Sequence, residues 1–277
     1  MRQEEIWDAD TAGRYDTPGT GMFAPEVLEP AVDRLARLAG GGRALEFAIG
    51  TGRIAVPLAE RGVPVTGIEL SVPMIEQLRT KADEATIPVV VGDMATTTAP
   101  GTYSLVHLVY NTISNLLTQD EQVQCFRNAA RHLDPGGRFV IELWVPELRK
   151  LPPGQTAVVW QDEPGRIGLD TYDVLRQQVV SHHFRFGAEE EREQREEREQ
   201  REEREQREEE AGREGEEGSG RNQLFRSPHR YIWPAELDLM ARLAGFELES
   251  RHADWAGAAF TAESRSHVSV YRLPPAG

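Results

Sequence analysis

Two carboxylates and two glycines early in the chain have the types and spacing of a nucleotide-binding site. A short apolar run is interrupted by Glu46, and Gly50 and Gly52 follow it directly. Glycine has no Cβ, so the backbone can turn sharply there and approach a ligand closely. A second apolar run at 63–70 carries Glu69, where a carboxylate can accept hydrogen bonds from ribose hydroxyls. These residues predict a site for the adenosine half of a cofactor.

A strand, a glycine turn, a helix and a second strand must position these residues. The apolar run at 44–48 has the composition of a buried parallel strand. Residues 53–61 predict a helix whose first amides point toward the glycine turn, and residues 63–70 predict the second strand. In an open α/β sheet, ligands bind beyond the carboxyl ends of the strands. Glu69 is therefore expected at the ligand-binding edge.

Two cofactor classes fit this unit. Residues 50–55 read Gly-Thr-Gly-Arg-Ile-Ala, which matches the dinucleotide pattern G-x-G-x-x-G/A, with Glu69 at a suitable distance. Glu46 argues against a dinucleotide, because a carboxylate in the first strand repels a pyrophosphate. The same carboxylate attracts the ammonium and sulfonium groups of S-adenosyl-L-methionine (SAM).

This stretch resembles motif I of the class I SAM-dependent methyltransferases, an acid–x–small–x–Gly–x–Gly pattern followed by an acid on the second strand. The resemblance implies that Glu46 lies under the methionine part of SAM and that Glu69 binds the ribose. Gly50 and Gly52 would form the turn, and Ala48 stands where the family usually has its first glycine. SAM is the cofactor that this resemblance implies.

The resemblance implies further cofactor-binding residues. The segment around Tyr15 is similar to the opening of many small-molecule methyltransferases, in which this Tyr closes over SAM; packing on the core is the alternative. Met74 would pack on the adenine or in the core. Asp93 would accept a hydrogen bond from the adenine amino group or cap a turn, with Met94 beside it. Asn111 follows a predicted strand at its carboxyl end and is expected near the reacting methyl group, with a structural turn as the alternative.

Two later stretches add to the resemblance. Residues 133–140 read Leu-Asp-Pro-Gly-Gly-Arg-Phe-Val, a sequence that recurs in class I methyltransferases before the fifth strand. That strand continues to Glu142 and Trp144, an ending similar to that of the sugar N-methyltransferases and their relatives. Ser104 departs from the family pattern, because an acid usually stands at this position.

The elements alternate as in an α/β fold. Apolar spacing predicts helices at 25–38, 71–82 and 120–133, and strands at 87–91 and 103–110. A last helix at 234–244 precedes strands at 246–251 and 266–273. The expected fold is a seven-stranded, mostly parallel, doubly wound sheet of the class I methyltransferase type, with a small antiparallel β cap.

The composition changes after Pro146. Alternating and β-branched residues predict antiparallel strands, and the predicted domains are a SAM-binding core at 1–146 and 233–277 with a β cap at 147–232. Within the cap, residues 188–220 form a low-complexity insertion in which Arg-Glu-Gln-Arg-Glu-Glu occurs three times. The repeat has no apolar stripe with which to pack, which favours a solvated, inert loop over a binding role.

The reaction implied by the family resemblance is methyl transfer from SAM to a nitrogen or oxygen nucleophile of a small molecule. An amine must be neutral to react, and His182, His183 and Tyr231 are the candidate catalytic residues. No clustered metal-ligand spacing is present, so no metal is expected. An NAD(P)-dependent oxidoreductase and a non-catalytic SAM-binding protein are the alternatives. The candidate acceptor-binding residues are Trp144, Arg226, His229 and Trp255.

Composition excludes several partner classes. The net charge of −15 argues against nucleic acid, since phosphate contacts need Lys and Arg. The chain has one cysteine, so no internal disulfide is expected and a reducing compartment is favoured. No apolar run has the length of a membrane span and no signal peptide is recognised, which predicts a soluble cytoplasmic protein. A homodimer remains compatible with these features.

Replacing residues 189–220 with a short Gly/Ser turn tests the inert-loop hypothesis. The change removes 16 Glu and 7 Arg, so the net charge moves from −15 to −6. Melting temperature and SAM affinity should stay nearly unchanged, because no apolar contact is lost and closure entropy depends weakly on loop length. A thermal melt and a SAM titration measure both. A large loss of either would mean that the insertion docks on the protein.

Overall fold

The computed structural model describes residues 6–186 and 223–275, in two compact units. We call Met1–Glu147 with Arg230–Gly277 the core unit, and Leu148–His229 the sheet unit. The insertion expected at 188–220, with its three Arg-Glu-Gln-Arg-Glu-Glu repeats, lies outside the described residues. The two units are described separately.

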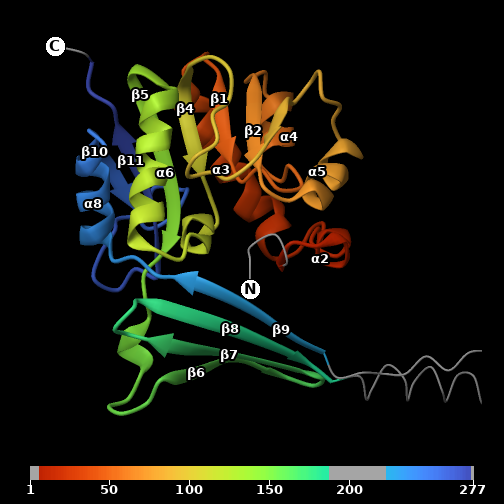
Figure 1. Cartoon of the computed structure of the whole chain (residues 1–277), viewed down its shortest axis with the longest axis vertical. Coiled ribbons are helices and arrows are strands. Elements are labelled where there is room, and N and C mark those ends of the chain that lie inside the picture. Colours follow the sequence, from red (N-terminus) through yellow and green to blue (C-terminus); the bar gives the residue numbers. More distant parts are fainter. Residues whose placement is uncertain (1–5, 187–222, 276–277) are drawn as a thin grey trace, which may run out of the picture. The chain divides into compact units, whose positions relative to one another are not determined.

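The core unit contains the predicted seven-stranded sheet, which confirms the fold class (Figure 1). The strand order is β10-β11-β5-β4-β1-β2-β3. Pairing from β5 through β3 is parallel, whereas β11 runs antiparallel to both β5 and β10. The strands are β1 (Ala44–Phe47), β2 (Val65–Glu69), β3 (Val89–Val91), β4 (Tyr103–Leu108), β5 (Leu133–Trp144), β10 (Glu247–His252) and β11 (Ser266–Arg272).

Helices bury apolar residues against both faces of this sheet. One buried cluster joins the strands to α3 (Pro25–Ala39), α4 (Ala55–Glu60) and α5 (Val72–Arg79). The other joins them to α6 (Gln119–His132) and α8 (Pro234–Leu243), which are neighbours on this face (Figure 1). Two short helices, α2 (Ala9–Gly13) and η1 (Gly21–Phe23), come before α3.

Local capping chemistry sets where these helices begin. Ser71 caps α5, its Oγ accepting a hydrogen bond from Met74 N at 3.2 Å. Thr118 and Glu121 form a reciprocal capping box at the start of α6, which satisfies two amides that have no partner within the helix. Proline occupies the first turn of α3 and of α8, where a missing N–H costs nothing.

The structure differs from the sequence predictions at three element ends. Strand β4 stops at Leu108, because Tyr110 and Asn111 both adopt left-handed backbone conformations. The Asp-Pro-Gly-Gly stretch at 134–137, expected to precede the fifth strand, lies within β5 as an irregular stretch, with Gly136 at a φ of 86°. Helix α5 ends at Arg79, three residues before the predicted end at residue 82.

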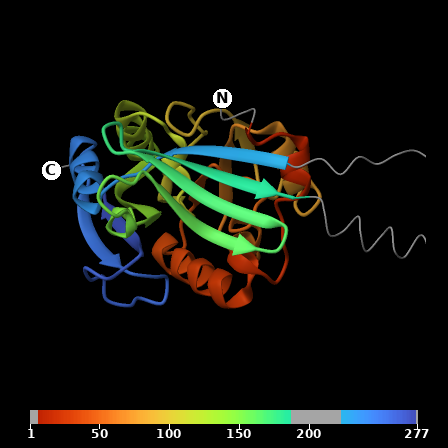
Figure 2. The same ribbon diagram turned by 90° about the horizontal axis from the view of Figure 1, so that it is seen from below.

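The sheet unit is a four-stranded antiparallel sheet with the order β6-β7-β8-β9 (Figure 2). A short helix, η3 (Leu148–Lys150), precedes it. Strands β8 and β9 are neighbours, as expected for the two strands that flank the insertion. The four strands are β6 (Ala157–Glu163), β7 (Arg166–Asp173), β8 (Gln178–Arg185) and β9 (Gln223–Arg230).

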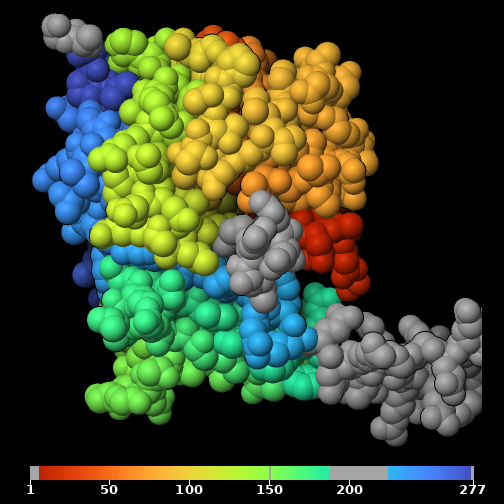
Figure 3. Space-filling model, viewed as in Figure 1, coloured from red at the N-terminus to blue at the C-terminus, as the bar shows by residue number. Residues whose placement is uncertain are grey.

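Helix α6 has an exposed and a buried side. Its outer side lies at the molecular surface, drawn in yellow-green in Figure 3, and carries Glu121, Arg127 and Arg131. Its inner side packs Phe126 and Cys125 fully into the core. Among the residues that the structure describes, none belongs to a helix long and apolar enough to cross a membrane.

Candidate functional site

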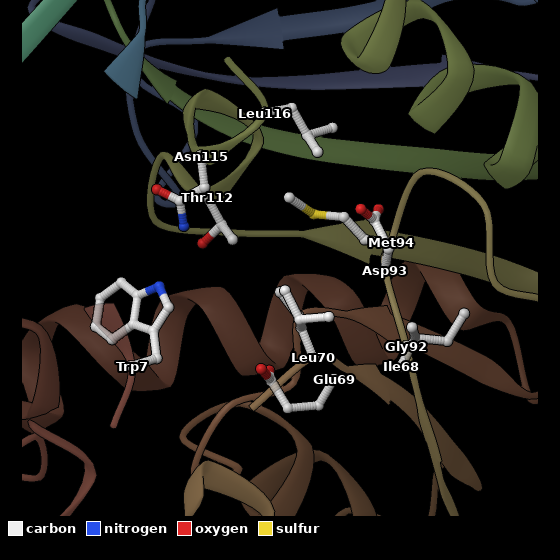
Figure 4. A pocket seen from close by; sticks show the side chains of 11 residues that line it. Trp7, Ile68, Glu69, Leu70, Gly92, Asp93, Met94, Thr112, Asn115 and Leu116 are labelled. Carbon is white, nitrogen blue, oxygen red and sulfur yellow. The ribbon is translucent and has the colours of Figure 1, made fainter. Parts of the chain in front are cut away.

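The carboxyl ends of the four parallel strands β1 to β4 meet at a pocket in the core unit (Figure 4). It encloses about 430 Å³ of empty space, part of which is open to solvent. Thr112, Asn115 and Leu116 lie opposite Glu69 and Leu70 across the pocket (Figure 4). The other lining residues are Trp7, Ala48, Ile68, Gly92, Asp93 and Met94.

The turn after β1 is built from residues in left-handed conformations. Ala48, Gly50 and Gly52 have φ angles of 51°, 57° and 82°. A Cβ on Gly52 would lie 2.3 Å from Leu78 Cδ1, so this glycine permits close packing on α5. A Cβ on Gly50 would meet only Ala48 O, at 4.0 Å, so the need for glycine at this position comes from its left-handed backbone conformation and not from crowding. Ala48 adopts a conformation that costs an L-residue roughly 1–2 kcal/mol, which explains why the motif usually has glycine there.

Glu69 connects this turn to the second strand. Its Oε2 accepts a hydrogen bond from Gly50 N and its Oε1 accepts one from Ser71 N, both at 2.8 Å. Burial raises the pKa of this carboxyl, and the two backbone donors oppose the shift. Each carboxylate oxygen keeps a further lone pair for a ligand hydroxyl. Glu69 therefore lies on the pocket wall and also holds the glycine turn in place.

Glu46 is buried within β1 and is not part of the pocket wall. Its Oε2 accepts no hydrogen bond from the described residues. Burial raises the pKa of this carboxyl to about 8, while the positive charge of Arg53 opposes the shift and the negative charge of Glu69 adds to it. In the sheet, Glu46 is in register with His107 of β4, which is fully buried. A nearby ligand cation would favour the ionised carboxylate.

Asp93 caps a turn and also lines the pocket. Its Oδ1 accepts a hydrogen bond from Ala95 N at 2.6 Å, so it caps the turn after β3. Asp93 also lines the pocket beside Met94 (Figure 4). A carboxylate oxygen next to an apolar side chain suits the amino edge and the ring face of a purine.

The N-terminal segment is fastened to the cofactor side of the core unit. Ser71 Oγ donates to Trp7 O at 2.6 Å, and Trp7 lines one end of the pocket. Thr51 Oγ1 donates to Asp16 Oδ1 at 2.6 Å, and Lys81 pairs with the other oxygen of Asp16. Tyr15 packs edge-to-face on Trp7 with ring centroids 5.7 Å apart, and burial raises its pKa to about 12. Tyr15 is thus next to a pocket residue.

Met74 and Asn111, which were also expected to bind the cofactor, lie away from the pocket wall as well. Met74 is buried at the start of α5, and Leu70 lines the pocket instead. Asn111 follows the left-handed Tyr110, and its Oδ1 accepts a hydrogen bond from Trp144 N at 3.3 Å. Thr112 and Asn115 line the pocket in its place. The polar run at 111–115 is the signal that pointed to this turn without resolving which of its side chains face the pocket.

Aromatic side chains gather at the carboxyl ends of β4 and β5 around Glu142. Its Oε2 accepts a hydrogen bond from Tyr110 N at 2.8 Å and its Oε1 accepts one from Trp255 Nε1 at 2.9 Å. Trp255 is buried, whereas Tyr110 and Trp144 are 40% and 52% exposed with ring centroids 5.9 Å apart. Arg53 lies over the Tyr110 ring, 5.3 Å from its centroid. Two large exposed aromatic rings so close to a ligand pocket are typical of a binding surface.

The remaining candidates divide between the units. Tyr231 is buried in the core unit and packs edge-to-face on Trp233. In the sheet unit, His182 bonds Thr171 at 3.0 Å and contacts Arg226, as expected for one histidine of an alternating pair. The other, His183, packs against Trp160 and Phe225, and its pKa is lowered, mainly by burial. His229 bonds Ser227 Oγ at 2.8 Å, and burial lowers its pKa to about 4.

The pocket residues fit SAM better than a dinucleotide. Glu69 and Asp93 supply acceptors for hydroxyl and amino groups, while Ile68, Leu70 and Met94 supply apolar surface. None of the eleven lining residues is basic, so the wall offers no cation for a pyrophosphate. SAM supplies a methyl group on a sulfonium, which is already a good leaving group. The protein then contributes mainly binding and alignment.

Comparisons with known proteins agree with this fit. A family model described as a methyltransferase domain matches residues 44–137. The solved structure of the CcbJ methyltransferase from Streptomyces caelestis is 34% identical, covers 99% of this chain and 98% of its own, and superposes with a TM-score of 0.75. The chain belongs to the class I SAM-dependent methyltransferases.

Two curated relatives of this methyltransferase carry more specific names. The cypemycin N-terminal methyltransferase of a Streptomyces species is 25% identical over 279 residues, which is 98% of each chain. The dTDP-3-amino-3,4,6-trideoxy-alpha-D-glucopyranose N,N-dimethyltransferase of Streptomyces venezuelae is 28% identical over 142 residues, which is 50% of this chain and 59% of that protein. The cofactor of this methyltransferase is SAM, and the oxidoreductase alternative has no support.

Replacing Glu69 with Ala should weaken SAM binding by ~1.5–3 kcal/mol, the usual range for hydrogen bonds to a charged group. The loss includes ribose contacts and the release of Gly50 N, which Glu69 holds. Glu76→Ala is a matched control, because Glu76 is exposed on α5. Calorimetric titration of both variants with SAM measures the effect. A folded Glu69→Ala protein with unchanged SAM affinity would rule out this assignment.

The buried carboxyl of Glu46 should make stability fall between about pH 4.5 and pH 8. Its pKa in the folded protein is about 8, above the ordinary value of 4.5, so the folded state binds more protons than the unfolded state in this window. The stabilisation is fully present below the ordinary pKa and is lost as the pH rises through 8. Glu46→Gln should therefore flatten the dependence of melting temperature on pH. If the melting temperatures of wild type and variant changed by the same amount between pH 4.5 and pH 8, the prediction would be contradicted.

Proposed function

We propose that this methyltransferase transfers the methyl group of SAM to an amino group of a small molecule. The observation that carries the proposal is the full-length similarity to a methyltransferase named for an N-terminal amine, joined by a relative named for an amino sugar. The first name places the methyl group at an N-terminus, and the second places it on the nitrogen of a nucleotide-linked amino sugar. The net charge of −15 agrees with an acceptor other than nucleic acid.

The acceptor is proposed to contact Tyr110 and Trp144. These rings follow β4 and β5, and Tyr110 precedes the pocket residue Thr112 by two positions. A ring-bearing acceptor can pack on such a platform with little loss of entropy, because both side chains have few rotatable bonds. Glu142 holds the backbone of Tyr110, and buried Trp255 holds Glu142 in turn. Trp255 then supports the acceptor site without exposing much surface of its own.

The sheet unit carries further candidate residues for acceptor binding and catalysis. Its side chains of interest are His182, His183, Arg226 and His229, with Tyr231 in the core unit as a further candidate. Burial lowers the pKa of both His183 and His229, so each imidazole is neutral near pH 7. A neutral imidazole is the form that can take a proton from an ammonium group. We propose His183 as the first of these residues to test as a general base.

We also propose that the enzyme works in the cytoplasm, as its single cysteine suggests. A homodimer remains a prediction, which the mass measured by light scattering will decide. The domain division into a SAM-binding core and a separate β cap is likewise part of this proposal. It is supported by the two compact units.

Turnover with methyl-labelled SAM tests the proposed reaction. The probes are the dTDP-linked 3-amino-3,4,6-trideoxyglucose, a short peptide with a free N-terminus, and the hydroxyl analogue of each. We expect label on an amine probe only, at a rate that rises with pH as the amine loses its proton. Glu69→Ala is the control for dependence on bound SAM. Label on the hydroxyl analogues alone, or on none of the probes, would contradict N-methylation of these acceptor classes.

A further inference from the structure

The inner side of α6 carries three buried polar residues, Gln122, Asn128 and His132. Gln122 and Asn128 have no exposed surface, and His132 is 3% exposed. Buried polar groups of this kind are stable only when hydrogen-bonded, so their partners show what they hold. Gln122 bonds the loop that follows β4, whereas Asn128 and His132 bond different parts of the loop that follows β3.

Gln122 holds the loop that follows β4. Its Nε2 donates to Leu116 O at 2.9 Å and lies 3.4 Å from Ile113 O. Leu116 lines the SAM pocket, as do Thr112 and Asn115 of the same loop. The carboxamide of Gln122 therefore fixes the backbone that presents one wall of the pocket.

The other end of the Gln122 carboxamide is held by Arg230, the last residue of β9. Arg230 Nη1 donates to Gln122 Oε1 at 2.5 Å, and Gln122 Nε2 donates to Arg230 O at 3.2 Å. Arg230 is 4% exposed and also pairs with Glu236 at the start of α8. This double contact prevents the carboxamide from rotating away from Leu116.

Asn128 holds the loop that follows β3. Its Nδ2 donates to Met94 O and to Thr97 O, both at 2.8 Å. Met94 lines the pocket next to Asp93, the expected acceptor for the adenine amino group. Both protons of the carboxamide are thus used on one loop, and Asn128 lies six residues along the helix from Gln122.

We propose that α6 sets the spacing between the two loops that enclose the adenosine half of SAM, with Gln122 and Asn128 as positioning residues for the cofactor. Neither side chain lines the pocket; each acts through the backbone of a residue that does. The two residues are six positions apart, which is ~9 Å along a helix. A rigid helix with one carboxamide for each loop keeps both walls at a fixed separation before SAM binds, and such preorganisation increases affinity.

His132 supplies a matched control on the same helix. Its Nε2 accepts a hydrogen bond from Ala99 N at 2.9 Å, and its Nδ1 lies 2.8 Å from Asn128 O. Ala99 is buried in the later part of the loop between β3 and β4, five residues after Met94, and does not line the pocket. Replacing His132 removes a buried hydrogen bond of the same kind without releasing a pocket residue.

The test compares Gln122→Glu, Asn128→Leu and His132→Leu in the full-length protein, with SAM and S-adenosylhomocysteine as probes. Glu at position 122 keeps an acceptor for Arg230 but cannot donate to Leu116 O. Leu at position 128 keeps the size of Asn and removes both donors. Dissociation constants are measured well below the lowest melting temperature, where a loss of stability alone leaves binding unchanged. Amide hydrogen exchange of residues 92–97 and 112–116 is measured in parallel.

We expect Gln122→Glu and Asn128→Leu each to raise both dissociation constants about tenfold, which corresponds to about 1.4 kcal/mol. Exchange should speed up at 112–116 in the first variant and at 92–97 in the second. His132→Leu should lower the melting temperature and change neither dissociation constant. Unchanged binding in Gln122→Glu, or an equal loss in His132→Leu, would overturn the proposal. If Asn128→Leu does not fold, the dissociation constants and exchange rates of Gln122→Glu alone decide the proposal.

Discussion

The carboxylate of Glu69 is the interaction on which the cofactor side of this enzyme depends. Its two oxygens accept hydrogen bonds from Gly50 N and Ser71 N, so one side chain joins the turn after β1 to the start of α5. Both donors are backbone amides, for which Glu69 supplies the acceptors. Burial makes this carboxylate costly to ionise, and backbone donors compensate by stabilising its charged form. The site is therefore organised by backbone groups before any ligand arrives.

Features that depend on short stretches of sequence were predictable. The capping role of Ser71, the strand that ends at Glu69 and the glycine turn follow from local propensity and spacing, and the structure contains them. The requirement for Gly52 differs from the expectation of a close ligand approach, because Leu78 of α5 occupies the space beside it. A contact between residues so far apart in the chain leaves no local signal.

Other site features depend on tertiary contacts that no local pattern shows. Asn111 was the natural choice among the polar residues after β4, yet the left-handed turn at Tyr110 directs its side chain to Trp144 N. Gln122 and Asn128 read as ordinary polar positions of a helix rich in charged residues, whereas they are fully buried. Their side-chain donors bond the loops that follow β4 and β3. Those loops come next to α6 only when the whole sheet packs, so no local pattern shows the contacts.

Cys125 lies on α6 between these two carboxamides and is the only thiol in the chain. It is fully buried, and burial raises its pKa, so the reactive thiolate is suppressed in the folded protein. A thiol reagent can then modify it only when α6 separates from the sheet. The wild-type enzyme thus contains a natural reporter of the opening of α6, the helix that holds the two pocket loops. The labelling rate reports how often that helix opens, and its change on adding SAM reports how strongly the cofactor holds it closed.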